Sequence, residues 1–61
     1  MSAAYNRGDY VWYVGTLVEP CVCVVVESNE ERTYVKPVGW PDHLIASTKN
    51  FVPCDKEGRL T

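Results

Sequence analysis

An uninterrupted apolar run, Cys21 to Val26, lies between Pro20 and a polar turn, Ser28 to Glu31. Valine dominates this run, and β-branched side chains favour a pleated strand over a helix. A run of about six residues between turn signals has the length of a strand with little exposed surface. We therefore predict a β-hairpin in which residues 21–27 and 32–38 pair across the turn at 28–31.

The rest of the chain predicts further short strands at residues 10–14, 43–46 and 51–54, with one 3₁₀ turn over residues 47–50. No stretch carries the 3.6-residue periodicity of a helix over ten residues. The polar residues 55–61 are expected to fray. Alternation along the strands predicts a core of Val11, Tyr13, Val22, Val24, Val26, Val35, Leu44 and Val52.

Length and charge narrow the classes of function. A chain of 61 residues forms one small domain that buries only about 60% of its unfolded surface. Its formal net charge of −2 removes the broad basic field through which most nucleic-acid binders gain affinity. No apolar stretch is long enough to span a membrane. Three cysteines cannot form a closed set of disulfides, and no secretory leader precedes them. These features predict an intracellular protein, cytoplasmic or nuclear, with free thiols.

Two segments resemble a known class of small barrels. The residues Arg-Gly-Asp-Tyr-Val-Trp at 7–12 resemble the opening strand of Tudor-type and myosin N-terminal SH3-like domains. Residues 44–53 resemble the close of SH3 domains, where a strand, a 3₁₀ turn with an Asn-aromatic pair and a last valine strand follow one another. The resemblance implies an all-β fold, an SH3-like five-stranded barrel with a short 3₁₀ turn before the last strand. It would be a single domain over residues 1–61, with its core at about 7–54.

The chain also departs from this class. It has no Ala-Leu-Tyr-Asp-Tyr-like stretch and no tryptophan pair at the start of a fourth strand. The resemblance therefore does not carry proline-peptide binding with it, and the fold is the part that it implies most directly.

Aromatic residues are the strongest functional signal, because a barrel this small cannot bury all of them. Exposed rings beside carboxylates bind cations and peptides. In Tudor domains an aromatic cage of this composition binds methylated lysine or arginine, and the resemblance extends that expectation here. The alternative is that the rings only cover the core or pack against a partner subunit. The predicted ligand-binding residues are Trp12, Tyr34 and Trp40 as anchors, with Tyr10, Asp9 and Asp42 beside them.

Other chemistry has weaker support. Cys21, Cys23, Cys54 and His43 could supply four zinc ligands, but Cys-Val-Cys within a strand does not match the turn spacing of structural zinc sites. We predict no metal, no cofactor and no catalytic residues. Arg32, Tyr34 and Lys36 share one predicted strand face, with Lys49 farther along, and such a face could stack bases and neutralise phosphates.

The sequence thus predicts a non-catalytic interaction module that binds a peptide or protein surface through exposed aromatic side chains. The acidic hairpin tip, Glu27, Glu30 and Glu31, would select basic partners. The alternatives are a nucleic-acid-binding small barrel and a structural subunit of a larger assembly. The oligomeric state is left open.

Overall fold

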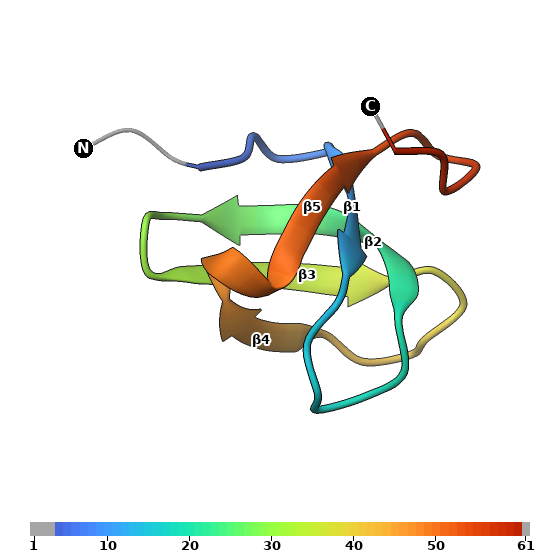
Figure 1. Cartoon of the computed structure of the whole chain (residues 1–61), viewed down its shortest axis with the longest axis horizontal. Helices are drawn as coiled ribbons and strands as arrows, with labels where there is room; N and C mark the ends of the chain where they lie inside the picture. Colours follow the sequence, from blue (N-terminus) through green and yellow to red (C-terminus); the bar gives the residue numbers. More distant parts are fainter. Residues whose placement is uncertain (1–3, 61) are drawn as a thin grey trace.

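The fold is all-β. A computed structural model describes residues 4–60, which form five antiparallel strands and one 3₁₀ turn (Figure 1). Each predicted strand and the predicted turn are confirmed to within one residue at either end. The elements are β1 (Tyr10–Tyr13), β2 (Cys21–Ser28), β3 (Arg32–Pro37), β4 (Leu44–Ser47), η1 (Thr48–Asn50) and β5 (Phe51–Cys54).

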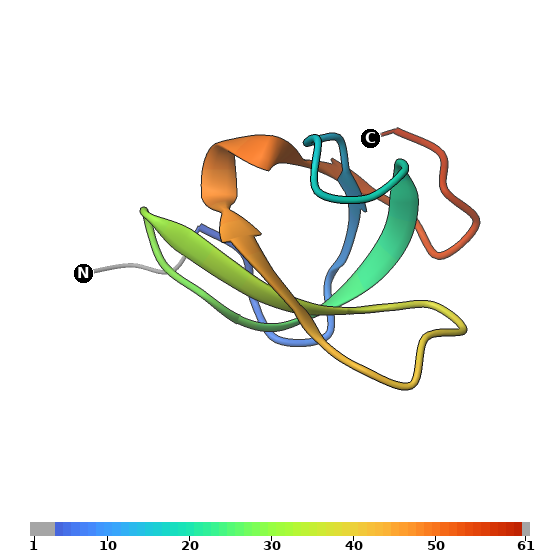
Figure 2. The same ribbon diagram turned by 90° about the horizontal axis from the view of Figure 1, so that it is seen from below.

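The strands form one sheet in the order β4-β3-β2-β1-β5, and every neighbouring pair is antiparallel. The edge strands β4 and β5 are consecutive in sequence and are joined only by η1. Within residues 4–60 they do not pair, so hydrogen bonding does not close the sheet into a barrel. The sheet curls instead, and Figure 2 shows the chain passing from β4 through η1 to β5 along one side of the curl.

A β-bulge at Val26 changes the alternation of β2. Val25 pairs with Val35, whereas the next registered pair is Glu27 with Tyr34, so Val26 is the extra residue. Such a residue leaves backbone groups outside the ladder. Here the Arg7 side chain donates a hydrogen bond from Nε to the Val26 carbonyl at 3.2 Å. As a result Glu27 lies on the same side of the sheet as Tyr34, which is the face opposite the core.

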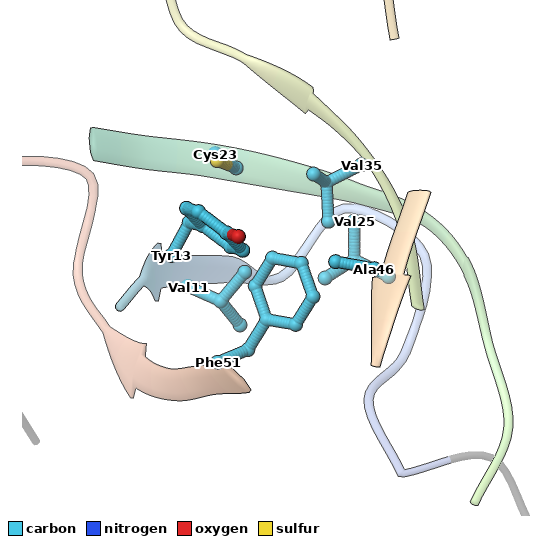
Figure 3. Packing of buried hydrophobic residues seen from close by; sticks show 7 residues of the cluster. All are labelled: Val11, Tyr13, Cys23, Val25, Val35, Ala46 and Phe51. Carbon is cyan, nitrogen blue, oxygen red and sulfur yellow. The ribbon is translucent and has the colours of Figure 1, made fainter. Parts of the chain in front are cut away.

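The core lies on the concave side of the sheet, and all five strands contribute to it (Figure 3). The rings of Tyr13 and Phe51 pack with centroids 5.4 Å apart and planes tilted by 59°, a favoured edge-type arrangement. The buried cluster consists of Val11, Tyr13, Cys23, Val25, Val35, Ala46 and Phe51. The predictions for Val11, Tyr13 and Val35 are confirmed.

The predicted inward face of β2 is wrong. Val22, Val24 and Val26 are only half-buried, and Cys23 and Val25 fill the core. This strand is apolar on both faces, so its own alternation cannot select one. The neighbouring strands select it: Val11 pairs with Cys23 and Val35 pairs with Val25, and paired residues point to the same side.

The same correction applies at the two edge strands. Ala46 is the buried residue of β4, while Leu44 is half-buried and packs against the edge of the cluster. On β5 the inward residue is Phe51 and not Val52, because Phe51 pairs with the buried Tyr13. A large ring at position 51 fills space that a valine on the other face could not reach.

Residues 55–60 form a hydrogen-bonded turn where the sequence predicted only a polar, fraying end; Thr61 lies outside the described residues. The Asp55 carboxylate accepts hydrogen bonds from the backbone N–H groups of Glu57 and Arg59, each at 2.9 Å. Leu60 forms an isolated bridge with Cys54. In this turn the Trp12 indole N–H donates a hydrogen bond to the carbonyl of Gly58. The turn therefore covers part of Trp12.

Replacing Gly58 with alanine is expected to loosen this turn without unfolding the domain. Gly58 has φ +87°, and an added Cβ would lie 3.1 Å from both Trp12 Cζ2 and Val22 Cγ2. Strained backbone of this kind costs about 1–3 kcal/mol. We expect faster amide exchange at residues 55–60 and a red-shifted tryptophan emission.

Gly39→Ala is the matched control, because Gly39 has φ +86° but no atom within 4 Å of an added Cβ. Both variants carry the backbone strain, and only Gly58→Ala adds tight contacts with Trp12 and Val22. Equal tryptophan spectra in the two variants would mean that the turn does not rest on Trp12.

Candidate functional site

The convex outer face of β3 presents Arg32, Tyr34 and Lys36, while Thr33, Val35 and Pro37 are buried beneath them. The prediction that the three polar and aromatic residues share a face is confirmed. On this face the Tyr34 side chain lies between its registered neighbours, Glu27 on β2 and Ile45 on β4.

Tyr34 is the centre of a small aromatic and apolar surface. The His43 ring packs against it, with centroids 4.9 Å apart and a tilt of 45°. Ile45, directly across the strand pair, is 55% exposed. An aliphatic side chain held beside an aromatic pair in this way offers a partner apolar area at little cost in conformational entropy.

A shallow depression opens beside Tyr34, at the tip of the β2–β3 hairpin. Its volume of about 220 Å³ is below the 300–1,000 Å³ range of small-molecule sites and suits one side chain of a larger partner. A second depression beside it includes Glu31, Arg32 and Ile45. We call the first the tip depression; it is lined by Glu27, Ser28, Asn29, Arg32, Tyr34 and Ile45.

Hydrogen bonds hold the hairpin tip in place. The Asn29 side-chain oxygen accepts from the backbone N–H groups of Glu31 and Arg32, each at 2.8 Å. The hydroxyls of Ser28, Thr33 and Thr48 form a chain with 2.8 Å links, and Thr48 then donates to the Asn29 carbonyl at 2.7 Å. The tip is thereby tied to η1, so the depression is preorganised and need not be ordered by a ligand.

The structure does not bring the three predicted ring anchors into one cage. Trp12 pairs with Val22 and Tyr34 with Glu27, so their β2 partners are five positions apart. At roughly 3.3 Å per residue this is about 16 Å along the strand. In addition, the Trp12 indole N–H is already bonded to Gly58. A single methyl-cation site cannot use both rings.

Trp40 lies in the loop between β3 and β4. The backbone N–H of Trp40 donates to the Pro37 carbonyl at 3.1 Å, and Gly39 has φ +86°, which a type II turn needs at that position. The turn leaves Val38 60% exposed and Trp40 36% exposed. Asp42, also exposed, follows in the same loop. This loop leads directly to His43 and so borders the Tyr34 surface.

The remaining predicted site residues lie elsewhere. The Asp9 carboxylate accepts a hydrogen bond from the Asn6 backbone N–H at 3.0 Å and closes its own turn. Tyr10 is half-buried and pairs with Val24 on one side and Cys54 on the other. Neither residue lines the tip depression.

Glu27 and Ile45 line the tip depression, and sequence reasoning did not place them there as partners of Tyr34. Glu27 reaches the outer face only because of the bulge at Val26, and a valine run gives no local sign of a bulge. Ile45 sits in a four-residue strand, where alternation alone does not distinguish the core side from the solvent side. The sequence signal that could have indicated Glu27 was the acidic hairpin tip, because this tip places Glu27 close to the start of β3.

The cysteines are free thiols within the described residues. The sulfur atoms of Cys21 and Cys23 are 3.7 Å apart. Burial, and then the hydrogen bond and charge of Cys21, raise the pKa of Cys23 to about 12. Burial, and then the charge of Asp55, raise the pKa of Cys54. No group of three or more metal-ligating side chains occurs in residues 4–60.

Alkylation is therefore expected to be selective. With iodoacetamide at pH 8, half-exposed Cys21 should react first. Cys23 should stay unmodified, because a thiol with a pKa of about 12 is ionised in only about one molecule in ten thousand at that pH. Mass spectrometry of the native protein should show one adduct, and the same protein in urea should show modification at every cysteine. Equal native labelling at Cys21 and Cys23 would contradict the assignment of Cys23 to the core.

The comparisons with known proteins give no family assignment: the chain matches no family model, no curated protein and no solved structure. Across residues 4–60, no helix has the length and apolar character needed to cross a membrane. Function must therefore be argued from the outer face itself.

Proposed function

We propose that this protein is a non-catalytic interaction module that binds a peptide or protein surface on the outer face of β3 and β4. We also propose that its fold is an SH3-like barrel. The order of the five strands and the 3₁₀ turn between β4 and β5 support that assignment.

The observation that carries the proposal is the preformed tip depression beside an exposed apolar surface. Tyr34 and Ile45 supply ring and aliphatic area, and Glu27, the registered neighbour of Tyr34 on β2, adds a carboxylate to the same depression. A cation is attracted both by a ring face and by a carboxylate. The partner that fits this surface presents an apolar side chain next to a lysine or arginine.

A peptide fits better than a nucleic acid. Arg32 and Lys36 lie on the same face as Tyr34, as base stacking would require, but Glu27 is the registered neighbour of that ring. A carboxylate there repels the phosphates of a stacked nucleotide. The contact area of such a small domain is limited, so we expect micromolar affinity.

Charge reversal at Glu27 tests the proposal. The probes are a fluorescein-labelled peptide of alternating lysine and leucine, its lysine-methylated form and a labelled single-stranded oligonucleotide of mixed sequence, followed by anisotropy. Wild type should bind the unmethylated peptide, and Glu27→Lys should weaken that binding about five- to tenfold.

Glu57→Lys makes the same change of net charge in the exposed C-terminal turn, far along the chain from the tip depression. It should change the affinity by less than about twofold if the effect of Glu27 is local. Equal losses in the two variants would reduce the binding to net charge alone. Preferential, steeply salt-dependent binding of the oligonucleotide would make nucleic acid the leading function, and no binding of either probe would favour a structural role.

A further inference from the structure

The two edge strands of the sheet differ in how many outward backbone groups are free to pair with another strand. On β5 few of these groups are free. The backbone N–H of Val14 donates to the Asn50 carbonyl at 2.8 Å. Hydrogen-bonded and non-hydrogen-bonded pairs alternate along an antiparallel ladder, so the backbone N–H and carbonyl positions of Phe51 and Pro53 point away from β1. Phe51 uses its N–H on the Thr48 carbonyl, and its carbonyl accepts the Tyr5 hydroxyl at 3.1 Å. Pro53 has no N–H to offer.

The β4 edge has the opposite character. The backbone N–H of Thr48 donates to the Glu31 carbonyl at 3.1 Å, so Arg32 and Ser47 form a non-hydrogen-bonded pair, as do Tyr34 and Ile45. The bonds of Arg32 agree with this pattern. Its backbone N–H donates to the Asn29 side-chain oxygen and its carbonyl accepts from the Asn29 backbone N–H, so neither group is directed at β4. The N–H and carbonyl of Ile45 and the N–H of Ser47 therefore point away from β3, and no strand among residues 4–60 pairs with them. The Ser47 carbonyl is not free, because Ser47 is the N-cap of η1 and its carbonyl accepts the first hydrogen bond of that turn.

Nothing in the sequence of β4 protects this edge. Natural edge strands are guarded by charged residues, proline or bulges. The strand Leu-Ile-Ala-Ser has none of these, apart from being short, and Ile45 is 55% exposed beside the unpaired backbone. Tyr5, η1 and Pro53 thus occupy or remove the outward backbone groups of β5, whereas nothing comparable blocks those of β4.

We propose that the open edge of β4 pairs with β4 of a second copy of this chain, antiparallel and about a two-fold axis. The charges that flank the strand favour that occupant. Asp42 lies two residues before β4 and Lys49 two residues after it, while the strand itself is uncharged. Antiparallel pairing centred on Ala46 brings each Asp42 to the end of the strand where Lys49 of the second copy lies, and it does so twice. Parallel pairing would bring like charges together.

The pairing has a structural consequence. In this register the Ser47 N–H of each copy would donate to the Ile45 carbonyl of the other, and these two backbone hydrogen bonds would join the two sheets into one. Ile45 of both copies would then lie on the same outer face, so the two Tyr34 surfaces would form one longer apolar strip. This inference concerns the edge of the sheet and stands independently of the peptide-binding proposal, which concerns its face.

Proline at position 47 blocks the edge with little strain. Ser47 has φ −59°, within the range that proline requires, and its side chain makes no capping hydrogen bond. Ser47→Pro removes one outward N–H, whereas the matched control Ser47→Ala keeps it. In sedimentation velocity over a concentration series, wild type and Ser47→Ala should reach the mass of a dimer, and Ser47→Pro should remain monomeric. A dispersed amide spectrum checks that Ser47→Pro is folded.

Charge exchange provides a second test that does not depend on the folding of the proline variant. Lys49→Asp and Asp42→Lys should each weaken the dimer about tenfold, and the double variant should restore it. Wild type that stays monomeric at millimolar concentration would overturn the proposal. So would equal self-association of Ser47→Pro and wild type, or a double variant no better than either single one.

Discussion

Val25→Asp is expected to unfold the domain. Val25 is 1% exposed and belongs to the core cluster, with Val35 as its registered neighbour and no basic side chain in that cluster to pair with a carboxylate. An unpaired buried carboxylate costs several kcal/mol even when it becomes protonated. A domain of this size has a total stability of roughly 3–9 kcal/mol. Far-UV circular dichroism should show loss of the sheet signal in buffer.

Val24→Asp is the adjacent control. Val24 lies on the outer face, half-buried, with Lys36 directly across the strand pair. An aspartate there gains a cross-strand partner of opposite charge, and the variant should remain folded, within about 1–2 kcal/mol of wild type in a urea titration. The reverse ranking, with Val24→Asp unfolded and Val25→Asp folded, would place the other face of β2 in the core.

Phe51→Ala should cost about 3–5 kcal/mol of unfolding free energy, the usual penalty for removing a buried phenylalanine. The ring is 4% exposed and packs against Tyr13 with centroids 5.4 Å apart. Its loss leaves a cavity between the two ends of the sheet, where a small domain has few other contacts. The urea midpoint should fall in proportion to this loss.

Val52→Ala provides the comparison on the same strand. Val52 is half-buried on the outer face opposite Trp12, and its truncation should cost about 1 kcal/mol. Similar losses for Phe51→Ala and Val52→Ala would contradict the assignment of Phe51 as the inward residue of β5.

The positions of the strands could be predicted from sequence, whereas the buried face of the central strand could not. Turn residues such as Ser28, Asn29 and Gly39 mark the ends of strands locally, and this is why each boundary agrees to within one residue. The inward face of β2 depends on its register with Val11 and Val35, which is a contact between strands. The C-terminal turn could not be predicted either, because it depends on hydrogen bonds from backbone N–H groups to Asp55 and on the contact of Gly58 with Trp12.

For the candidate site too, the features set by local sequence could be predicted and those set by contacts between distant segments could not. Alternation correctly places Arg32, Tyr34 and Lys36 on one face, since the period of a strand is a local property. It cannot reveal that Trp12 is covered, because Gly58 lies 46 residues away in sequence. Nor can it reveal Glu27 beside Tyr34, which follows from the bulge, or the open edge at Ile45 and Ser47, which follows from the hydrogen-bond phase of β4.

A two-dimensional amide NMR titration with the unmethylated lysine–leucine peptide tests the central claim most directly. That claim is that recognition occurs beside Tyr34 on the outer face of β3 and β4, and not at Trp12. We predict shifts at the amides of Glu27, Tyr34 and Ile45, while the Trp12 indole N–H, held by Gly58, stays in place. Movement of the Trp12 indole with unchanged Tyr34 and Ile45 amides would contradict the account and return the binding site to β1.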